Sequence, residues 1–104
     1  MNYTVIVPFY NEERNISSFN KKLINNLKKF INEKRFFEII YIDDGSYDKT
    51  FSELEKLDTG SIETLLIRHR INLSQSAALN TGISHSKYEN IIILDGDLQN
   101  DPND

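Results

Sequence analysis

The 104-residue chain lacks cysteine altogether, so it can form neither a disulfide framework nor a cysteine-based metal site. A reducing compartment is compatible with that composition. The chain also lacks a block of basic residues, and its formal net charge is −4 at pH 7. Nucleic acid is therefore not expected as its main partner.

Long hydrophobic runs are also missing. No apolar stretch approaches the roughly 20 residues that span a bilayer. The N-terminal residues up to Pro8 lack the basic start and the apolar core of a signal peptide, and their short apolar run is typical of a strand. Nothing in these residues anchors the chain in a membrane.

Four short apolar segments predict strands, and segments of helical periodicity lie between them. The expected strands are Tyr3–Val7, Phe36–Ile42, Ile62–Ile67 and Ile91–Leu94. This alternation predicts right-handed βαβ units, with a parallel sheet and helices on its faces. We expect one α/β, Rossmann-like domain over residues 1–104 with strand order 3-2-1-4, in which the first and fourth strands are neighbours.

The first expected helix has apolar residues at spacings of three and four. They are Ile16, Phe19, Leu23, Ile24, Leu27, Phe30 and Ile31. Asn11 is its expected N-cap, and Glu12 and Glu13 suit the positive end of its dipole.

Two further helices are expected. The second has an apolar face made by Phe51, Leu54 and Leu57. Asp48 or Ser46 can cap its start, and Gly60 is expected to close it. The third starts near Asn72 or Ser74. Its small residues, which predict close packing on the sheet, are Ala77, Ala78 and Gly82.

Polar clusters follow three of the four expected strands. These clusters are Pro8–Glu12, Asp43–Ser46 and Asp95–Gln99. Ligands of open parallel sheets bind beyond the carboxyl ends of the strands, and these ends share one edge. Each cluster also has a simpler interpretation, because Asp-Gly pairs form turns and Asn11 can serve only as a helix cap. The isolated His69 and His85 are not expected to be ligands.

The cluster Asp95-Gly96-Asp97 is the most suggestive of a metal. Two carboxylates one residue apart suit a hard divalent cation such as Mg²⁺ or Mn²⁺, and Gln99 adds a neutral oxygen. Gly96 lets the backbone bend and a ligand approach closely. Neither G-x-x-x-x-G-K-[ST] nor G-x-G-x-x-G occurs, so a diphosphate would be bound through the cation instead of a glycine-rich loop.

Four motifs carry a family resemblance. They are V-I-V-P-F-Y-N-E-E, I-D-D-G-S-Y-D-K-T, N-L-S-Q-S-A-A-L-N-T-G-I and L-D-G-D-L-Q-N-D-P. In this order and spacing they resemble the N-terminal half of family 2 glycosyltransferases of the GT-A fold. The last motif looks most like the dolichol- or polyprenol-phosphate sugar transferase branch. One departure is Ser74, where relatives often have glycine.

The resemblance implies a nucleotide-sugar-binding domain and a role for each matching residue. Pro8, Tyr10 and Glu12 would line the nucleotide pocket. Asp44 would contact the base, and Asp95 would lie near the ribose and the diphosphate.

The resemblance also implies the metal ligands and the reaction. Asp97 is the implied main ligand, with Asp95 and Gln99 beside it. The expected reaction is metal-dependent, inverting transfer of a sugar from a nucleotide-sugar donor to a polyprenol phosphate or a saccharide. Its expected place is the cytoplasm, including the cytoplasmic membrane surface.

Other interpretations remain open on the sequence alone. The metal motif closes the chain, so neither a general base nor an acceptor-binding half is expected in these residues. The chain could therefore be a truncated, non-catalytic nucleotide-binding module or interaction fragment. Its fourth strand would form an uncovered sheet edge, which favours homo-oligomers. A haloacid dehalogenase-like phosphatase and a receiver domain also place aspartates after a strand, but earlier in the chain.

Overall fold

The computed structural model describes residues 1–31 and 34–96. Its sheet has four parallel strands in the order β3-β2-β1-β4. The strands are β1 (Asn2–Phe9), β2 (Phe36–Asp43), β3 (Glu63–Arg68) and β4 (Asn90–Ile93). The predicted fold class and strand order are therefore confirmed. The order places the carboxyl ends of β1, β2 and β4 at one edge of the sheet.

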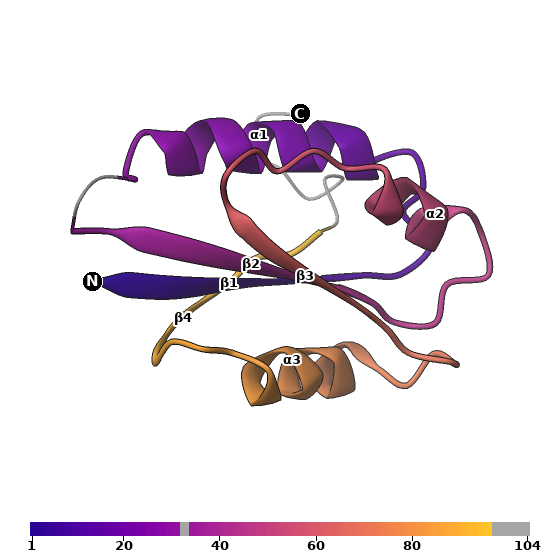
Figure 1. Cartoon of the computed structure of the whole chain (residues 1–104). Coiled ribbons are helices and arrows are strands. Elements are labelled where there is room, and N and C mark those ends of the chain that lie inside the picture. Colours follow the sequence, from indigo (N-terminus) through magenta and orange to yellow (C-terminus); the bar gives the residue numbers. More distant parts are fainter. Residues whose placement is uncertain (32–33, 97–104) are drawn as a thin grey trace.

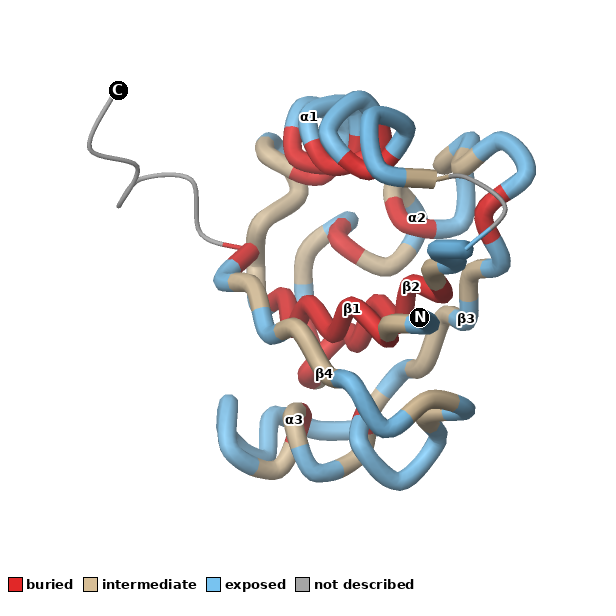
Figure 2. The backbone as a smooth tube through the Cα atoms, turned by 90° about the vertical axis from the view of Figure 1, so that its left-hand side faces the viewer, coloured by how far each residue is buried: buried red, intermediate tan, exposed pale blue. Residues whose placement is uncertain are grey.

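Helices cover both faces of this sheet (Figure 1). Helices α1 (Ile16–Lys28) and α2 (Thr50–Glu55) lie on one face, and α3 (Gln75–Ser84) lies on the other. Figure 2 shows that burial is concentrated in the two central strands between these layers. Among the described residues, no helix has the length and hydrophobicity required to cross a bilayer.

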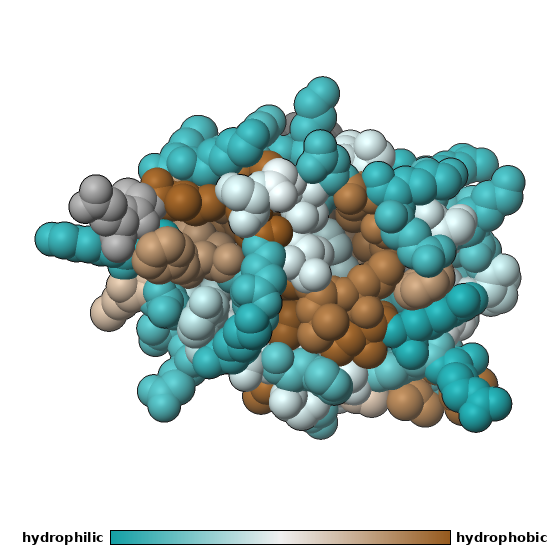
Figure 3. Space-filling view, viewed as in Figure 1, coloured by the Kyte–Doolittle hydropathy of each residue, from teal (hydrophilic) through white to brown (hydrophobic). Residues whose placement is uncertain are grey.

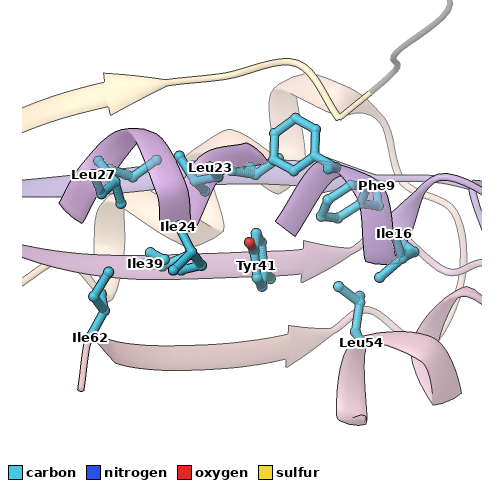
Figure 4. Packing of buried hydrophobic residues seen from close by; sticks show 12 residues of the cluster. Phe9, Ile16, Leu23, Ile24, Leu27, Ile39, Tyr41, Leu54 and Ile62 are labelled. Carbon is cyan, nitrogen blue, oxygen red and sulfur yellow. The ribbon is translucent and has the colours of Figure 1, made fainter. Parts of the chain in front are cut away.

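The apolar stripe of α1 packs on the sheet as predicted. Figure 4 shows Leu23, Ile24 and Leu27 of α1 beside Ile39 and Tyr41 of β2, and all five side chains are buried. The stripe was predicted too long, however. Phe30 lies beyond the last residue of α1 and is 48% exposed.

The opposite face of the sheet packs against small residues of α3. Ala78 contacts Ile6, Ile40 and Ile42 and is fully buried. A Cβ added to Gly82 would lie 2.6 Å from Cγ2 of Ile6, closer than any relaxed contact. The close helix–sheet approach predicted from small residues is thus present in the structure.

Two of the expected helix ends are wrong. Asn15, not Asn11, precedes α1, because Asn11 takes a positive φ of 52° and turns the chain. Glu12 also lies before the helix, where its carboxylate accepts a hydrogen bond from Nδ2 of Asn15 at 2.6 Å. Gly60 has a φ of 62° but lies beyond Lys56, the C-cap of α2, in the turn that leads toward β3.

The start of α3 agrees with the sequence, and at α2 the predicted Asp48 bonds the first turn although Lys49 is the N-cap. Oδ1 of Asp48 accepts a hydrogen bond from the backbone N–H of Thr50, the first residue of α2, at 2.8 Å. Oγ of Ser74 accepts one from the backbone N–H of Ala77 at 3.0 Å and caps α3. Each bond satisfies a donor that the first turn of a helix otherwise leaves unpaired.

Candidate functional site

A pocket of about 430 Å³ opens at the carboxyl edge of the sheet. It is lined by Pro8, Phe9, Tyr10, Glu12, Asp44, Asn72, Ser74, Gln75 and Asp95. The volume lies within the range of small-molecule sites, roughly 300 to 1,000 Å³. All five residues predicted to bind a nucleotide sugar therefore line one pocket.

The chain after β1 is tied to the chain after β2. The backbone N–H of Asp44 donates to the carbonyl oxygen of Phe9 at 2.9 Å, which continues the pairing of the two strands. Oγ of Ser46 accepts from the backbone N–H of Asn11 at 2.9 Å. Oγ1 of Thr50 accepts from that of Glu12 at 2.8 Å. These bonds fix the wall of the pocket that carries Glu12.

Asp44 is the most heavily bonded side chain of the pocket. Its carboxylate accepts hydrogen bonds from Nδ2 of Asn72 at 3.0 Å and from the backbone N–H groups of Leu73 and Ser74, both at 3.1 Å. A fourth contact, at 2.8 Å, joins its Oδ1 to Nδ1 of His69. The side chain is only 4% exposed. Asp44 thus holds the segment that forms the opposite wall of the pocket.

Gly45 allows that segment to lie against the end of β2. Its φ is +75°, and a Cβ there would lie 2.1 Å from the carbonyl carbon of Ile71 and 2.2 Å from the backbone nitrogen of Asn72. Any other residue would combine backbone strain with a clash against main-chain atoms. The Asp44-Gly45 pair, which the sequence also allowed to be a simple turn, therefore shapes the pocket.

Asp43 does not line the pocket. It is fully buried, and its Oδ1 accepts from the backbone N–H of Ser46 at 3.0 Å. Its Oδ2 has no hydrogen bond and lies 3.7 Å from Nε of Arg68. The guanidinium of Arg68 in turn stacks over the ring of Phe51, 4.5 Å from its centroid. The first aspartate of the pair thus serves the turn and the β3 side of the sheet.

Tyr10 lines the pocket and contacts a second aromatic residue. Tyr10 is 42% exposed and meets the ring of Tyr47 edge-on, with centroids 6.4 Å apart.

Figure 3 shows another part of the surface, where apolar residues gather along the β3 edge and hydrophilic residues surround them. Leu65, a residue of β3, is 38% exposed.

The predicted metal ligands lie only partly within the described residues. Asp95 lines the pocket directly after β4, whereas Asp97 and Gln99 lie outside residues 1–31 and 34–96. Within those ranges, no group of three or more histidine, aspartate or glutamate side chains is arranged to hold a metal. The oxygen of Asp95 suits a hard cation, but it is one ligand of the three that the sequence predicted.

Four lining residues lie outside the predicted set, and they are Phe9, Asn72, Ser74 and Gln75. Phe9 and Ser74 carry no chemistry in the sequence pattern, and only their strand-end and N-cap positions could have indicated them. Asn72 was expected near the start of the third helix, and in the structure its Nδ2 donates to Asp44. His69 was expected to be an isolated residue, but both its ring nitrogens have partners, at Asp44 and Thr81.

Comparison with known sequences gives a match over nearly the whole chain. The model of the family described as Glycosyl transferase family 2 matches residues 4–104. The chain is 29% identical to dodecaprenyl-phosphate galacturonate synthase of Rhizobium johnstonii, over 97% of its own length and 29% of that protein. It is 33% identical to the undecaprenyl-phosphate 4-deoxy-4-formamido-L-arabinose transferase of Proteus mirabilis, over 95% of its own length and 30% of that protein.

Solved structures show the same arrangement. Mannosyltransferase PcManGT from Pyrobaculum calidifontis, in complex with GDP-Man and Mn²⁺, aligns with a TM-score of 0.70 and 28% identity. That alignment covers 91% of this chain and 27% of PcManGT. S. aureus TarS 1–349 aligns with a TM-score of 0.73 and 27% identity, over 93% of this chain and 28% of its own. The chain thus spans less than a third of each of these relatives.

Proposed function

Because the chain belongs to glycosyltransferase family 2, we propose that its pocket binds the nucleotide-sugar donor of a sugar transfer. The observation that carries this proposal is the convergence of Pro8, Tyr10, Glu12, Asp44 and Asp95 on one pocket at the carboxyl edge of the sheet. In PcManGT, a similar fold is found with GDP-Man and Mn²⁺. Residues 1–104 would then form the donor-binding part of the transferase.

The residues on each side of the pocket would contact a different part of the nucleotide. Pro8, Tyr10 and Glu12 would border the nucleoside. Asp44 would meet an N–H group of the base. Its Oδ2 accepts from Nδ2 of Asn72 at 3.0 Å and from the backbone N–H of Ser74 at 3.1 Å, and Nδ2 of Asn72 also lies 3.0 Å from the carbonyl oxygen of Asp44. Asn72 can therefore keep one partner when a base takes the other.

The diphosphate would lie near Asp95. We propose that Asp95, Asp97 and Gln99 hold Mg²⁺ or Mn²⁺, since carboxylate and amide oxygens are the ligands that these cations prefer. A bound cation would neutralise the charge that grows on the nucleoside diphosphate as it leaves. In the transfer, the bond from the anomeric carbon to the diphosphate breaks, and an acceptor oxygen bonds to that carbon from the opposite face.

The proposed acceptor is a polyprenol phosphate, with a saccharide as the alternative. The relatives named above include a dodecaprenyl-phosphate synthase and an undecaprenyl-phosphate transferase. A lipid phosphate is already anionic, so it can attack without a general base. Such an acceptor would place the reaction at the cytoplasmic face of a membrane. We also propose that other protein covers β4, the edge strand of the described sheet, and that a second copy of this chain can be that protein.

The proposal is tested by titrating the purified chain with UDP- and GDP-sugars, with and without Mn²⁺, by calorimetry. We expect saturable binding that requires Mn²⁺ and is lost in Asp97→Ala. Incubation with polyprenol phosphate then separates a transferase from a module that binds the nucleotide without transferring the sugar, which is the second candidate. An absence of binding to every nucleotide sugar in the presence of Mn²⁺ would overturn both.

A further inference from the structure

His69 lies behind the wall of the pocket and touches two elements at once. It directly follows β3, and its backbone N–H donates to the carbonyl oxygen of Asp43 at 2.9 Å. Its ring nitrogen Nδ1 lies 2.8 Å from Oδ1 of Asp44, and Nε2 lies 2.8 Å from Oγ1 of Thr81 in α3. The His69 side chain is only 10% exposed. It does not line the pocket, so it would not touch a ligand there.

The chemistry of these partners fixes which nitrogen carries the proton. An ionised carboxylate can only accept hydrogen bonds, so Nδ1 of His69 must donate to Asp44. In a neutral imidazole Nε2 is then an acceptor, and the hydroxyl of Thr81 donates to it. The order of donors therefore runs from Thr81 through His69 to Asp44. Of the two neutral tautomers, only the one with hydrogen on Nδ1 satisfies both contacts.

This chain of contacts supports the residue that holds the pocket wall together. Asp44 accepts three of its four bonds from residues 72–74, and only the bond from His69 comes from outside that segment. Ser74 of the same segment caps α3, the helix that carries Thr81. His69 thus links Asp44, which follows β2, to Thr81 of α3. The wall segment that contains Ser74 continues into that same helix.

We propose that His69 is a positioning residue of the donor pocket, which holds the Asp44 carboxylate in place through its Nδ1 hydrogen and is itself held by Thr81. The inference rests on the proposed function, because it assumes that the ligand of the pocket is a nucleotide sugar. Loss of the Nδ1 donor lets the Asp44 carboxylate turn, and the segment of Asn72 and Ser74 loses its anchor. Loss of ring volume alone has no such effect on the ligand.

Two substitutions separate the two ring nitrogens. In His69→Asn the amide nitrogen reaches the place of Nδ1 and keeps the bond to Asp44. In His69→Gln the amide reaches the place of Nε2 and keeps only the side toward Thr81. We expect His69→Asn to bind GDP-mannose or UDP-glucose with Mn²⁺ nearly as the unchanged protein does. Binding by His69→Gln should be about tenfold weaker, as expected from the loss of one hydrogen bond to a charged group.

The chain provides its own control. It has only one other histidine, His85, which is exposed and whose Nδ1 lies 2.9 Å from the carbonyl oxygen of Thr81. His85→Gln should leave nucleotide binding unchanged. It also assigns the imidazole signals in ¹⁵N–¹H spectra of the full chain without ligand. Those spectra should show a hydrogen on Nδ1 of His69, a result that needs no His69 variant to fold.

The outcomes distinguish this inference from the proposed function. If the unchanged chain binds nucleotide sugar and His69→Gln binds equally well, His69 positions nothing and the inference fails alone. Equal weakening in His69→Asn and His69→Gln would assign His69 to packing and also overturn it, as would spectra without a hydrogen on Nδ1 of His69. If the unchanged chain binds neither nucleotide sugar, the proposed function fails and the inference fails with it.

Discussion

Gly96 lies directly against the ring of Phe9. A Cβ at Gly96 would be 2.5 Å from both Cδ1 and Cε1 of that ring and 2.8 Å from the carbonyl oxygen of Pro8. The ring of Phe9 cannot withdraw, because it is buried and packs edge-on against Phe19 with centroids 5.4 Å apart. The residue between the two aspartates of the metal motif must therefore be glycine for Asp95 to stay beside β1.

Gly96→Ala tests that relationship. The added methyl group should push the chain after β4 away from Phe9 and carry Asp95 out of the pocket. We expect Mn²⁺-dependent binding of GDP-mannose to weaken about tenfold or more, since one proposed ligand of the cation is displaced. Gly60→Ala is the matched control, because its Cβ meets nothing within 4 Å although its φ is positive. It should destabilise the fold by about 1 kcal/mol and leave the dissociation constant unchanged.

Gly82→Ala tests the packing of α3 on the sheet. Its Cβ would lie 2.6 Å from Cγ2 of Ile6 and 2.9 Å from Cδ1 of Ile42, both in the buried core. Overpacking of this kind costs about 1 to 3 kcal/mol, more than the roughly 1 kcal/mol that alanine gains over glycine in a helix. Urea denaturation should therefore show a net loss of stability. In Ser76→Ala, at an exposed position of α3, stability should rise or stay the same.

Tyr41 predicts how stability depends on alkaline pH. Burial raises the pKa of its phenol well above the ordinary value of 10.0, and its hydroxyl donates to Oδ1 of Asn20 at 2.7 Å. Above that ordinary value the unfolded chain loses this proton while the folded chain keeps it. The contribution of Tyr41 is thus complete below pH 10.0 and falls by up to about 1.4 kcal/mol per pH unit above it.

Tyr41→Phe should remove that part of the alkaline slope, as measured by urea denaturation at several pH values. The variant loses the hydrogen bond to Asn20 at every pH, so the slope and not the offset is the relevant quantity. Tyr47→Phe, at a residue that is 85% exposed, should keep the slope of the unchanged protein. The same slope in Tyr41→Phe and in the unchanged protein would show that Tyr41 titrates normally.

Two glutamates that contact the same residue should differ greatly in their effect on stability. Glu38 is buried and its Oε2 accepts from Oγ1 of Thr4 and from the backbone N–H of Lys87, both at 2.7 Å. Glu38→Ala removes the acceptor of the buried Thr4 hydroxyl and of the partly buried N–H of Lys87, and should cost about 1 to 3 kcal/mol. Glu63 pairs with the ammonium group of Lys87 at the surface. Glu63→Ala should change the urea midpoint little, because water and salt screen exposed ion pairs.

The positions of the strands were predictable because each combines a short apolar run with β-branched residues. The strand order followed from the expected Rossmann-like arrangement, in which the first and fourth strands are neighbours. The role of Asn11 was not predictable in the same way. Capping and a positive φ are both ordinary roles of asparagine, and the choice depends on Tyr47, whose backbone N–H donates to Oδ1 of Asn11 across 36 residues.

The contacts of His69 could not be predicted from the sequence, for a similar reason. Its partners Asp44 and Thr81 lie 25 and 12 residues away along the chain, and no spacing pattern connects them. The sequence identified Asp44 as a site residue through its family resemblance, but not the four donors that surround it. The places of Asp97 and Gln99 remain predictions of the sequence, since both lie outside the described residues.

The proposed function depends on the binding of a nucleotide sugar in the pocket at the carboxyl edge of the sheet. Mapping of backbone amide chemical shifts during titration with GDP-mannose or UDP-glucose and Mg²⁺ tests it most directly. We expect the largest shifts at five residues that line the pocket, which are Tyr10, Glu12, Asn72, Gln75 and Asp95. Saturable shifts confined to the smaller groove between α1 and α2, at Lys21, Asn25 and Lys56, or no shifts at all, would contradict it.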